Sequence, residues 1–184
     1  LTADPSVVSW FGNTEWGLGL PFPELLANEA LLSDFPYLKD CAALDWHCHQ
    51  AERTENQTFD LNSLSLMEQN PNRTVLALGM GFMVLPSSYP IVDIFMAHQG
   101  DDTDKQALLL EARDKLTSGI GQTAIIWRKE WKANVQSVDG TEARWLTLLQ
   151  EKITLGAALD QLSGTDFDFQ TGLIKAIENR WILG

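Results

Sequence analysis

The chain has 184 residues, of which 45% are hydrophobic and 21% charged, a composition typical of a globular protein with one ordinary domain or two small ones. Its formal net charge is −12, and residues 1–72 hold eleven acidic but only two basic side chains. Because a nucleic-acid site needs positive charge to displace counterions from phosphates, this imbalance disfavours DNA or RNA binding. The longest apolar run, Val75 to Leu85, is too short for a membrane span of about 20 residues, so we expect no membrane contact.

The two cysteines, Cys41 and Cys48, are too few for a disulfide scaffold. Seven residues apart on one helix, their Cα atoms would lie about 10 Å apart, whereas a disulfide needs roughly 4.4–6.8 Å. Reduced thiols, together with the lack of a visible signal peptide, predict a cytoplasmic protein. Because the chain begins with Leu1 rather than Met, we expect an N-terminal portion to be missing.

The first part of the chain, residues 1–98, is predicted to be mostly helical with a short strand segment. A short helix is expected from Phe22 to Leu32, and a longer one from Tyr37 to Arg53 whose cap is Ser33 or Asp34. The longer helix carries apolar residues at spacings of three and four, which predicts one buried face. These residues are Tyr37, Cys41, Leu44, Cys48 and Ala51.

An apolar segment with two glycines follows in the same part. Thr74 to Leu85 is predicted to be one long strand or two short ones, with Gly79 and Gly81 allowing a bulge or bend. Pro86 then interrupts the strand, and Tyr89 to His98 is expected to be helical.

Three segments without a steady period separate the predicted elements. Residues 1–21 are expected to be irregular, and the polar stretch before Thr74 holds a short helix at 61–68. Residues 99–104 are rich in Asp and Gly and form the best linker candidate. This linker divides the chain into residues 1–98 and residues 105–184.

The second part, residues 105–184, is predicted to be a winged-helix-like module, which gives an α+β fold class. After a helix at Lys105 to Thr117, two strands at Gln122 to Arg128 and Trp131 to Val138 suggest a hairpin that turns at Lys129-Glu130. The remaining elements are a helix from Asp139 to about Glu151, a helix at Leu155 to Leu162 capped by Thr154, a helix at Phe169 to Asn179, and a closing strand at Trp181 to Leu183.

The sequence shows no pattern typical of a catalytic or metal site. Trp46 to His49 is the most suggestive cluster, but His47 and His49 would point about 200° apart on a helix and could not hold one metal ion together. Cys48 has histidines beside it in sequence but lies on the apolar face, which disfavours a role as nucleophile. We therefore predict no enzyme activity, no metal and no cofactor, and leave open a partner contact or a ligand shared with His98.

Trp127, Arg128 and Trp131 on the predicted hairpin are the best binding candidates. An exposed strand edge can bind an extended peptide as an additional strand, with nearby aromatic residues holding its side chains. The alternative is that both tryptophans fill the core while Arg128 lies on the surface.

Several short blocks resemble one bacterial family that carries a DNA-binding label. The blocks are Phe35 to Leu38, Ala43 to His47, Ser88 to Ile94, Trp127-Arg128, Thr154 to Leu159 and Trp181 to Leu183. Some relatives in that family resemble accessory subunits of methanobactin- and bufferin-type enzymes. The family's N-terminal helical part, which carries the DNA-binding label, is largely absent here because Leu1 falls near its end. The helix at 105–117 is also longer than expected for the family.

The resemblance implies an accessory subunit. Such a subunit would bind an iron-dependent TIM-barrel oxidase and present a cysteine-containing ribosomal precursor peptide, with the iron ligands belonging to the oxidase. For the partner face we select Trp46, His47, Tyr89 and Asp93, and for the peptide the hairpin residues named above. A DNA-binding transcriptional regulator is the alternative, which the charge disfavours.

Overall fold

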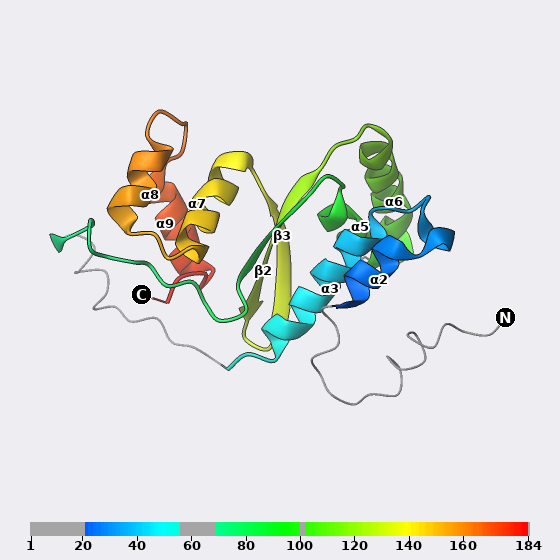
Figure 1. Ribbon diagram of the computed structural model, residues 1–184, viewed down its shortest axis with the longest axis horizontal. Helices are drawn as coiled ribbons and strands as arrows, with labels where there is room; N and C mark the ends of the chain where they lie inside the picture. Colours follow the sequence, from blue (N-terminus) through cyan, green and yellow to red (C-terminus); the bar gives the residue numbers. More distant parts are fainter. Residues whose placement is uncertain (1–20, 56–68, 100–101, 184) are drawn as a thin grey trace.

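The computed structural model describes residues 21–55, 69–99 and 102–183. Within these ranges the strands form one antiparallel sheet in the order β1-β2-β3, made of β1 (Met83–Ser87), β2 (Gln122–Lys129) and β3 (Lys132–Val138). Helices cover both faces of this sheet (Figure 1). The mixed α+β class predicted from the sequence is confirmed.

The helices form two groups, one on each side of the sheet (Figure 1). One group contains α2 (Pro21–Asn28), α3 (Leu38–Glu52), α5 (Ile91–Gln99) and α6 (Asp102–Thr117), with a short 3₁₀ turn, η1 (Ala30–Leu32), between α2 and α3. The other group contains α7 (Gly140–Gln150), α8 (Leu155–Leu162) and α9 (Phe169–Glu178).

The central strand β2 is buried on both faces because its alternate side chains enter two different cores. Ile125 and Trp127 pack with the α7–α9 group, whereas Ala124 and Ile126 pack with α3 and α5. This alternation is the two-residue period of a strand. A run of apolar residues without polar interruption, as in Ala124 to Trp127, is therefore what a strand between two helical layers requires.

The core beneath α7, α8 and α9 contains two fully buried tryptophans, Trp145 and Trp181. Side-chain oxygens cap the three helices as expected for their N-termini: Asp139 accepts from Glu142 N–H, Thr154 from Ala157 N–H, and Asp168 from Gln170 and Thr171 N–H. The predicted starts at Asp139 and Thr154 are confirmed, and each cap satisfies an amide that the helix itself cannot pair.

The apolar face predicted on α3 is confirmed, but its predicted cap is wrong. Leu44 and Ala51 are buried, and Cys41 and Cys48 pack against the same core. The N-cap is Tyr37, whose side chain makes no capping bond. The expected caps, Ser33 and Asp34, come too early because η1 and the following turn use residues 30–37 before the helix begins.

The segment predicted as a strand from Thr74 to Leu85 is only partly one. Leu78 forms an isolated bridge with Ile182, so the closing strand predicted at Trp181 to Leu183 is a single bridge, and the chain then turns before β1. Gly81 makes this turn with a φ of 79°, and a Cβ there would lie 2.9 Å from the Ala51 Cα. The bend predicted at the glycines is confirmed, and glycine is required by both the backbone and the close helix.

The strand β1 continues through Pro86 rather than ending there. Pro86 pairs in register with Thr123, one residue before the strand ends at Ser87. Proline is compatible with this position because β1 lies at the edge of the sheet.

The β2–β3 hairpin turns one residue later than predicted. Lys129 pairs with Lys132, so the two turn residues are Glu130 and Trp131 rather than Lys129 and Glu130. Glu130 has a φ of 60°, a conformation that a two-residue hairpin turn demands and that most side chains disfavour. The shift by one residue places Trp131 at the tip of the hairpin.

The sheet takes strands from both predicted parts of the chain, β1 from residues 1–98 and β2 and β3 from residues 105–184. The helix α6 begins at Asp102, inside the predicted linker at 99–104. Residues 1–20 and the short helix expected at 61–68 lie outside the described residues. No helix in the described ranges has the length and apolar character needed to cross a membrane.

Candidate functional site

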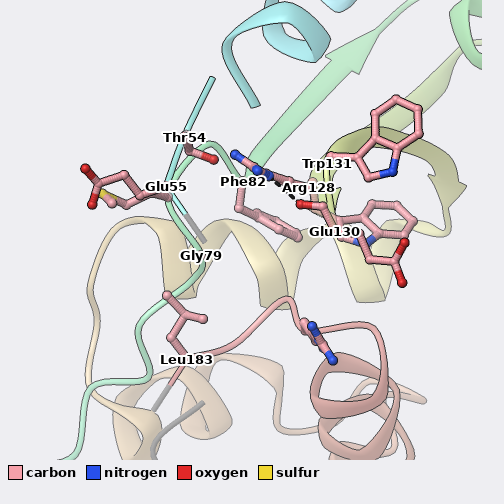
Figure 2. Close-up of a pocket in the computed structure, with 11 residues that line it drawn as sticks. Thr54, Glu55, Gly79, Phe82, Arg128, Glu130, Trp131 and Leu183 are labelled. Atoms are coloured by element: carbon pink, nitrogen blue, oxygen red, sulfur yellow. Dashed lines mark hydrogen bonds between the residues drawn. The ribbon is translucent and has the colours of Figure 1, made fainter. Parts of the chain in front are cut away.

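The hairpin residues selected from the sequence line one cavity of about 410 Å³ (Figure 2). Trp127, Arg128 and Trp131 contribute to it from the end of β2 and the turn. The other walls come from the end of the α3 segment, the turn before β1 and the chain after α9: Thr54, Glu55, Gly79, Met80, Phe82, Glu130, Arg180 and Leu183. Three segments that are distant in sequence therefore meet at the hairpin tip.

The two hairpin tryptophans have different environments. Trp127 is 7% exposed and lies edge-on to Trp181, with ring centroids 5.6 Å apart, so it belongs largely to the core. Trp131 is 67% exposed, and the ammonium of Lys132 lies 4.7 Å from its ring centroid. The alternative, that both tryptophans fill the core, is therefore correct for Trp127 and wrong for Trp131. A largely exposed tryptophan offers apolar contact area to a ligand.

Arg128 holds the hairpin tip against the end of α3. Its Nε donates to the Glu130 carbonyl at 2.6 Å, and its Nη1 donates to the Glu52 carbonyl at 3.2 Å. Both acceptors are neutral backbone groups, so the guanidinium keeps its full positive charge at the wall of the cavity. Figure 2 shows the Arg128 side chain between Thr54 and Glu130.

The outer edge of β3 has unpaired backbone groups. Residues that flank a two-residue turn form a hydrogen-bonded pair, and such pairs alternate along an antiparallel ladder. The register starting at Lys129 and Lys132 therefore directs the N–H and C=O of Ala133, Val135 and Ser137 away from β2. Glu52 Oε1 accepts from Ala133 N–H at 3.2 Å. In the described residues no partner takes the outward groups of Val135 and Ser137.

The outer edge of β1 offers no free donor over its described length. Val84 N–H donates to Gln150 Oε1 at 3.1 Å, and Pro86 has no N–H. An added strand could not receive hydrogen bonds from this edge. Among the described residues the sheet is therefore open on β3 and closed on β1, a difference that was not predicted from the sequence. Pro86 was the one signal in the sequence that could have shown it.

The four residues selected for a partner face come from α3 and from the start of α5. On α3, Trp46 is half-buried with its ring 5.5 Å from that of His49, and burial lowers the pKa of His47. Tyr89 precedes α5 and lies edge-on to Tyr37 at 6.4 Å. Asp93 on α5 forms a 2.7 Å salt bridge with Lys115 of α6, so its carboxylate already has an internal partner.

A second cavity, of about 590 Å³, lies between α3, α5 and α6 and was not predicted from the sequence. Its walls are mostly apolar, and its polar groups include Asp45, His98 and Arg113. Burial raises the pKa of Asp45, while the nearby charge of His98 lowers it. His98 Nδ1 donates to the Ile94 carbonyl at 2.7 Å.

The two cysteines are free and half-buried. Burial raises the pKa of both the Cys41 and the Cys48 thiol to about 12, with neighbouring carboxylates adding to the effect. A thiol with so high a pKa is protonated at neutral pH and is a poor nucleophile or metal ligand. Among the described residues, no group of three or more His, Cys, Asp or Glu side chains could hold a metal ion.

No family model, curated protein or solved structure matches this chain. The family resemblance of its short sequence blocks therefore remains a prediction.

Proposed function

We propose that this chain is a non-catalytic, cytoplasmic interaction protein that binds an extended peptide as a fourth strand along β3. The observation that carries the proposal is the difference between the two sheet edges. Val135 and Ser137 present outward N–H and C=O groups in the described structure, whereas β1 presents no outward donor. A peptide that pairs with these groups gains main-chain hydrogen bonds without a requirement for particular side chains.

Selectivity for the peptide comes from the hairpin tip. Glu130 and Trp131 line both the cavity of about 410 Å³ and a shallower hollow of about 310 Å³ that includes Lys132 and Asn134 of β3. A strand lying along β3 would bring its side chains to this hollow, where Trp131 provides an aromatic surface. Main-chain pairing would thus supply affinity, and the tip would distinguish one peptide from another.

The partner of this protein is an iron-dependent TIM-barrel oxidase, and the peptide is its cysteine-containing ribosomal precursor. This assignment rests on the resemblance of the short sequence blocks. The chain would hold the precursor while the oxidase supplies the iron and performs the chemistry. The partner face includes Trp46 and His47 on α3, Tyr89 just before α5, and Asp93 on α5.

The C-terminal hairpin with α7, α8 and α9 serves as a winged-helix-like module in this proposal, with a peptide rather than DNA as its ligand. The net charge of −12 opposes a nucleic-acid backbone. Affinity purification of the protein from its native lysate tests the two partners. Stoichiometric recovery of an iron-binding barrel protein is expected, and recovery of defined DNA fragments instead would favour the regulator.

Strand addition is tested with Ser137→Pro. Proline removes one outward N–H and leaves the ladder to β2 intact, because Ser137 does not donate to β2. Peptides selected from a random dodecapeptide library against the wild-type protein should bind the variant about tenfold more weakly, the effect of losing roughly one hydrogen bond. Ser137→Thr keeps the donor and should keep the affinity.

Amide exchange identifies the binding edge directly. A selected peptide should slow exchange at Val135 and Ser137 and leave Val84 unchanged. Peptides that bind with no protection at Val135 and Ser137 would contradict strand addition at β3.

A further inference from the structure

Two arginines line the cavity at the hairpin tip, and neither has a carboxylate partner among the residues that the structure describes. Arg128 donates only to backbone carbonyls, and Arg180 is exposed. All salt bridges within the described ranges involve other side chains. Guanidinium groups bind planar anions through paired hydrogen bonds, so unneutralised arginines at one cavity favour a carboxylate ligand.

Arg180 occupies a backbone position that normally belongs to glycine. After α9, Arg180 N–H donates to the Ile177 carbonyl at 3.0 Å and Trp181 N–H donates to the Ala176 carbonyl at 2.7 Å. This is the Schellman pattern, in which the residue after the helix end adopts a left-handed conformation. Arg180 has a φ of 58°, where a side chain is unfavourable and glycine is not. The chain therefore retains an arginine at a place where glycine would stabilise the fold.

Backbone strain concentrates around this cavity. In the described residues, three non-glycine residues have a positive φ: Glu130, Lys152 and Arg180. Glu130 and Arg180 both line the cavity, whereas Lys152 does not. Residues held in unfavourable backbone conformations by the surrounding structure occur preferentially at active sites and ligand sites.

The other residues that line the cavity indicate which chemical group the ligand carries next to its carboxylate. Phe82 and Trp127 are 8% and 7% exposed, and with Leu183 they form an apolar wall. Two glutamates also line the cavity, but Figure 2 shows the carboxylates of Glu55 and Glu130 at opposite margins, with Arg128 between them. The lining of the cavity thus combines two arginines with an apolar wall.

We infer that this cavity is a subsite for a carboxylate carried next to an apolar side chain, either the C-terminus of the bound peptide or an acidic side chain within it. The assignment of this carboxylate to a peptide rests on the proposed function. Arg180 binds the carboxylate, and Phe82, Trp127 and Trp131 contact the apolar group. The subsite would fix the direction and register of the peptide, which main-chain pairing alone leaves open.

Four small probes test the subsite without a peptide. N-acetyl-phenylalanine carries a terminal carboxylate, N-acetyl-glutamyl-phenylalanine amide carries a side-chain carboxylate, N-acetyl-phenylalanine amide is neutral, and phenethylamine is a cation. Each is titrated to about 10 mM while the indole N–H signals of Trp127 and Trp131 are followed by NMR, a range suited to the millimolar affinity of such small ligands. At least one acid should bind about tenfold more tightly than the neutral amide, and the tighter acid identifies the source.

Arg180→Gly has a matched control in Lys152→Gly. Lys152 occupies the same Schellman position after α7, with a φ of 59°, and lies outside the cavity. Both variants should raise the thermal unfolding midpoint, because glycine removes the strain. Arg180→Gly alone should lower the affinity for the acid to that for the amide.

Three results would overturn the subsite: equal affinity for acid and amide or no binding at all, tighter binding of phenethylamine, or an acid affinity that Arg180→Gly does not change. The proposed function fails separately, since it depends on Ser137→Pro. The Ser137→Pro variant should retain the affinity of the wild type for the acid probe. If Ser137→Pro weakens peptide binding while the wild type binds acid and amide probes equally, strand addition is supported and the subsite is excluded.

Discussion

The two outer edges of the same sheet differ in what they offer to another strand. On β1, the Val84 N–H is bonded to Gln150 and Pro86 has no N–H. On β3, Glu52 takes the Ala133 N–H, while Val135 and Ser137 have no partner in the described structure. An exposed sheet edge favours unwanted pairing and is normally blocked. An edge blocked on one side and left open on the other is therefore a reason to expect a partner strand on β3.

The difference between the edges comes from the helices beside them. Gln150 is the last residue of α7 and Glu52 is the last residue of α3, so each edge receives one side chain from a helix end. On β1 that single side chain suffices because proline removes the next outward donor. On β3 it leaves the following outward donors unpaired.

The largest expected difference is in amide exchange of the free protein. Val135 and Ser137 should exchange on the order of 100-fold faster than Val84, since only the latter N–H is hydrogen-bonded at its edge. Exchange followed by NMR measures these rates. Equal protection of all three amides would mean that the β3 edge is covered in solution.

The next largest effect is expected from Gln150→Leu. This change leaves the Val84 N–H without its acceptor and should lower the free energy of unfolding by about 1–2 kcal/mol. Urea denaturation measures it. Gln150→Glu keeps an oxygen acceptor and is the matched control, so a similar loss in both variants would place the effect elsewhere than in this bond.

A smaller loss is expected from Asp139→Ala, because Asp139 caps the helix that carries Gln150. Removing the cap should lower the free energy of unfolding by about 1 kcal/mol. Hydrogen bonds from the Glu142 backbone N–H and the Thr141 side chain lower the pKa of Asp139 below its ordinary 3.8. The contribution of ionised Asp139 to the free energy of unfolding is therefore present above about pH 4, and it is lost as the pH falls through the lowered pKa of the folded state.

Asp139→Asn separates capping from titration. The amide still accepts the hydrogen bonds but does not titrate, so this variant should lose less stability than the wild type on going from about pH 5 to pH 2.5. Thermal unfolding over that range measures the difference. An identical pH dependence in both proteins would show that other carboxylates dominate.

The smallest effect is expected from Glu52→Ala, which frees the Ala133 N–H at an exposed site. The stability loss should be about 0.5 kcal/mol, while exchange at Ala133 should rise to the rate of Val135. Glu52→Gln keeps an acceptor and should change neither quantity. An unchanged exchange rate in Glu52→Ala would indicate that another group covers this amide.

Local sequence patterns predicted most of the helices and strands. The three- and four-residue spacing of Leu44, Cys48 and Ala51 gave the buried face of α3, and Asp139 and Thr154 gave helix starts. These features follow from contacts within a few residues of the chain. The errors were also local: the cap of α3 and the hairpin turn each depended on one competing turn whose geometry the residue types did not specify.

The candidate site was predicted only in part. The sequence selected Trp127, Arg128 and Trp131, and the structure brings them to one cavity. It gave no sign of Arg180, because the arginine lies about fifty residues further along the chain and its left-handed backbone depends on how α9 ends. Arginine after a helix is unremarkable in a sequence and becomes informative only with its φ angle.

By itself, the sequence determined the α+β class, the two strands of the hairpin and the helices that follow it, because periodicity and capping act over short distances. Only the tertiary structure decided which edge of the sheet is open and which tryptophan is exposed. The bond that closes β1 joins residues 66 apart, and the bond that shortens the open edge of β3 joins residues 81 apart. Contacts over such separations are set by how the helices pack on the sheet, and no local pattern records them.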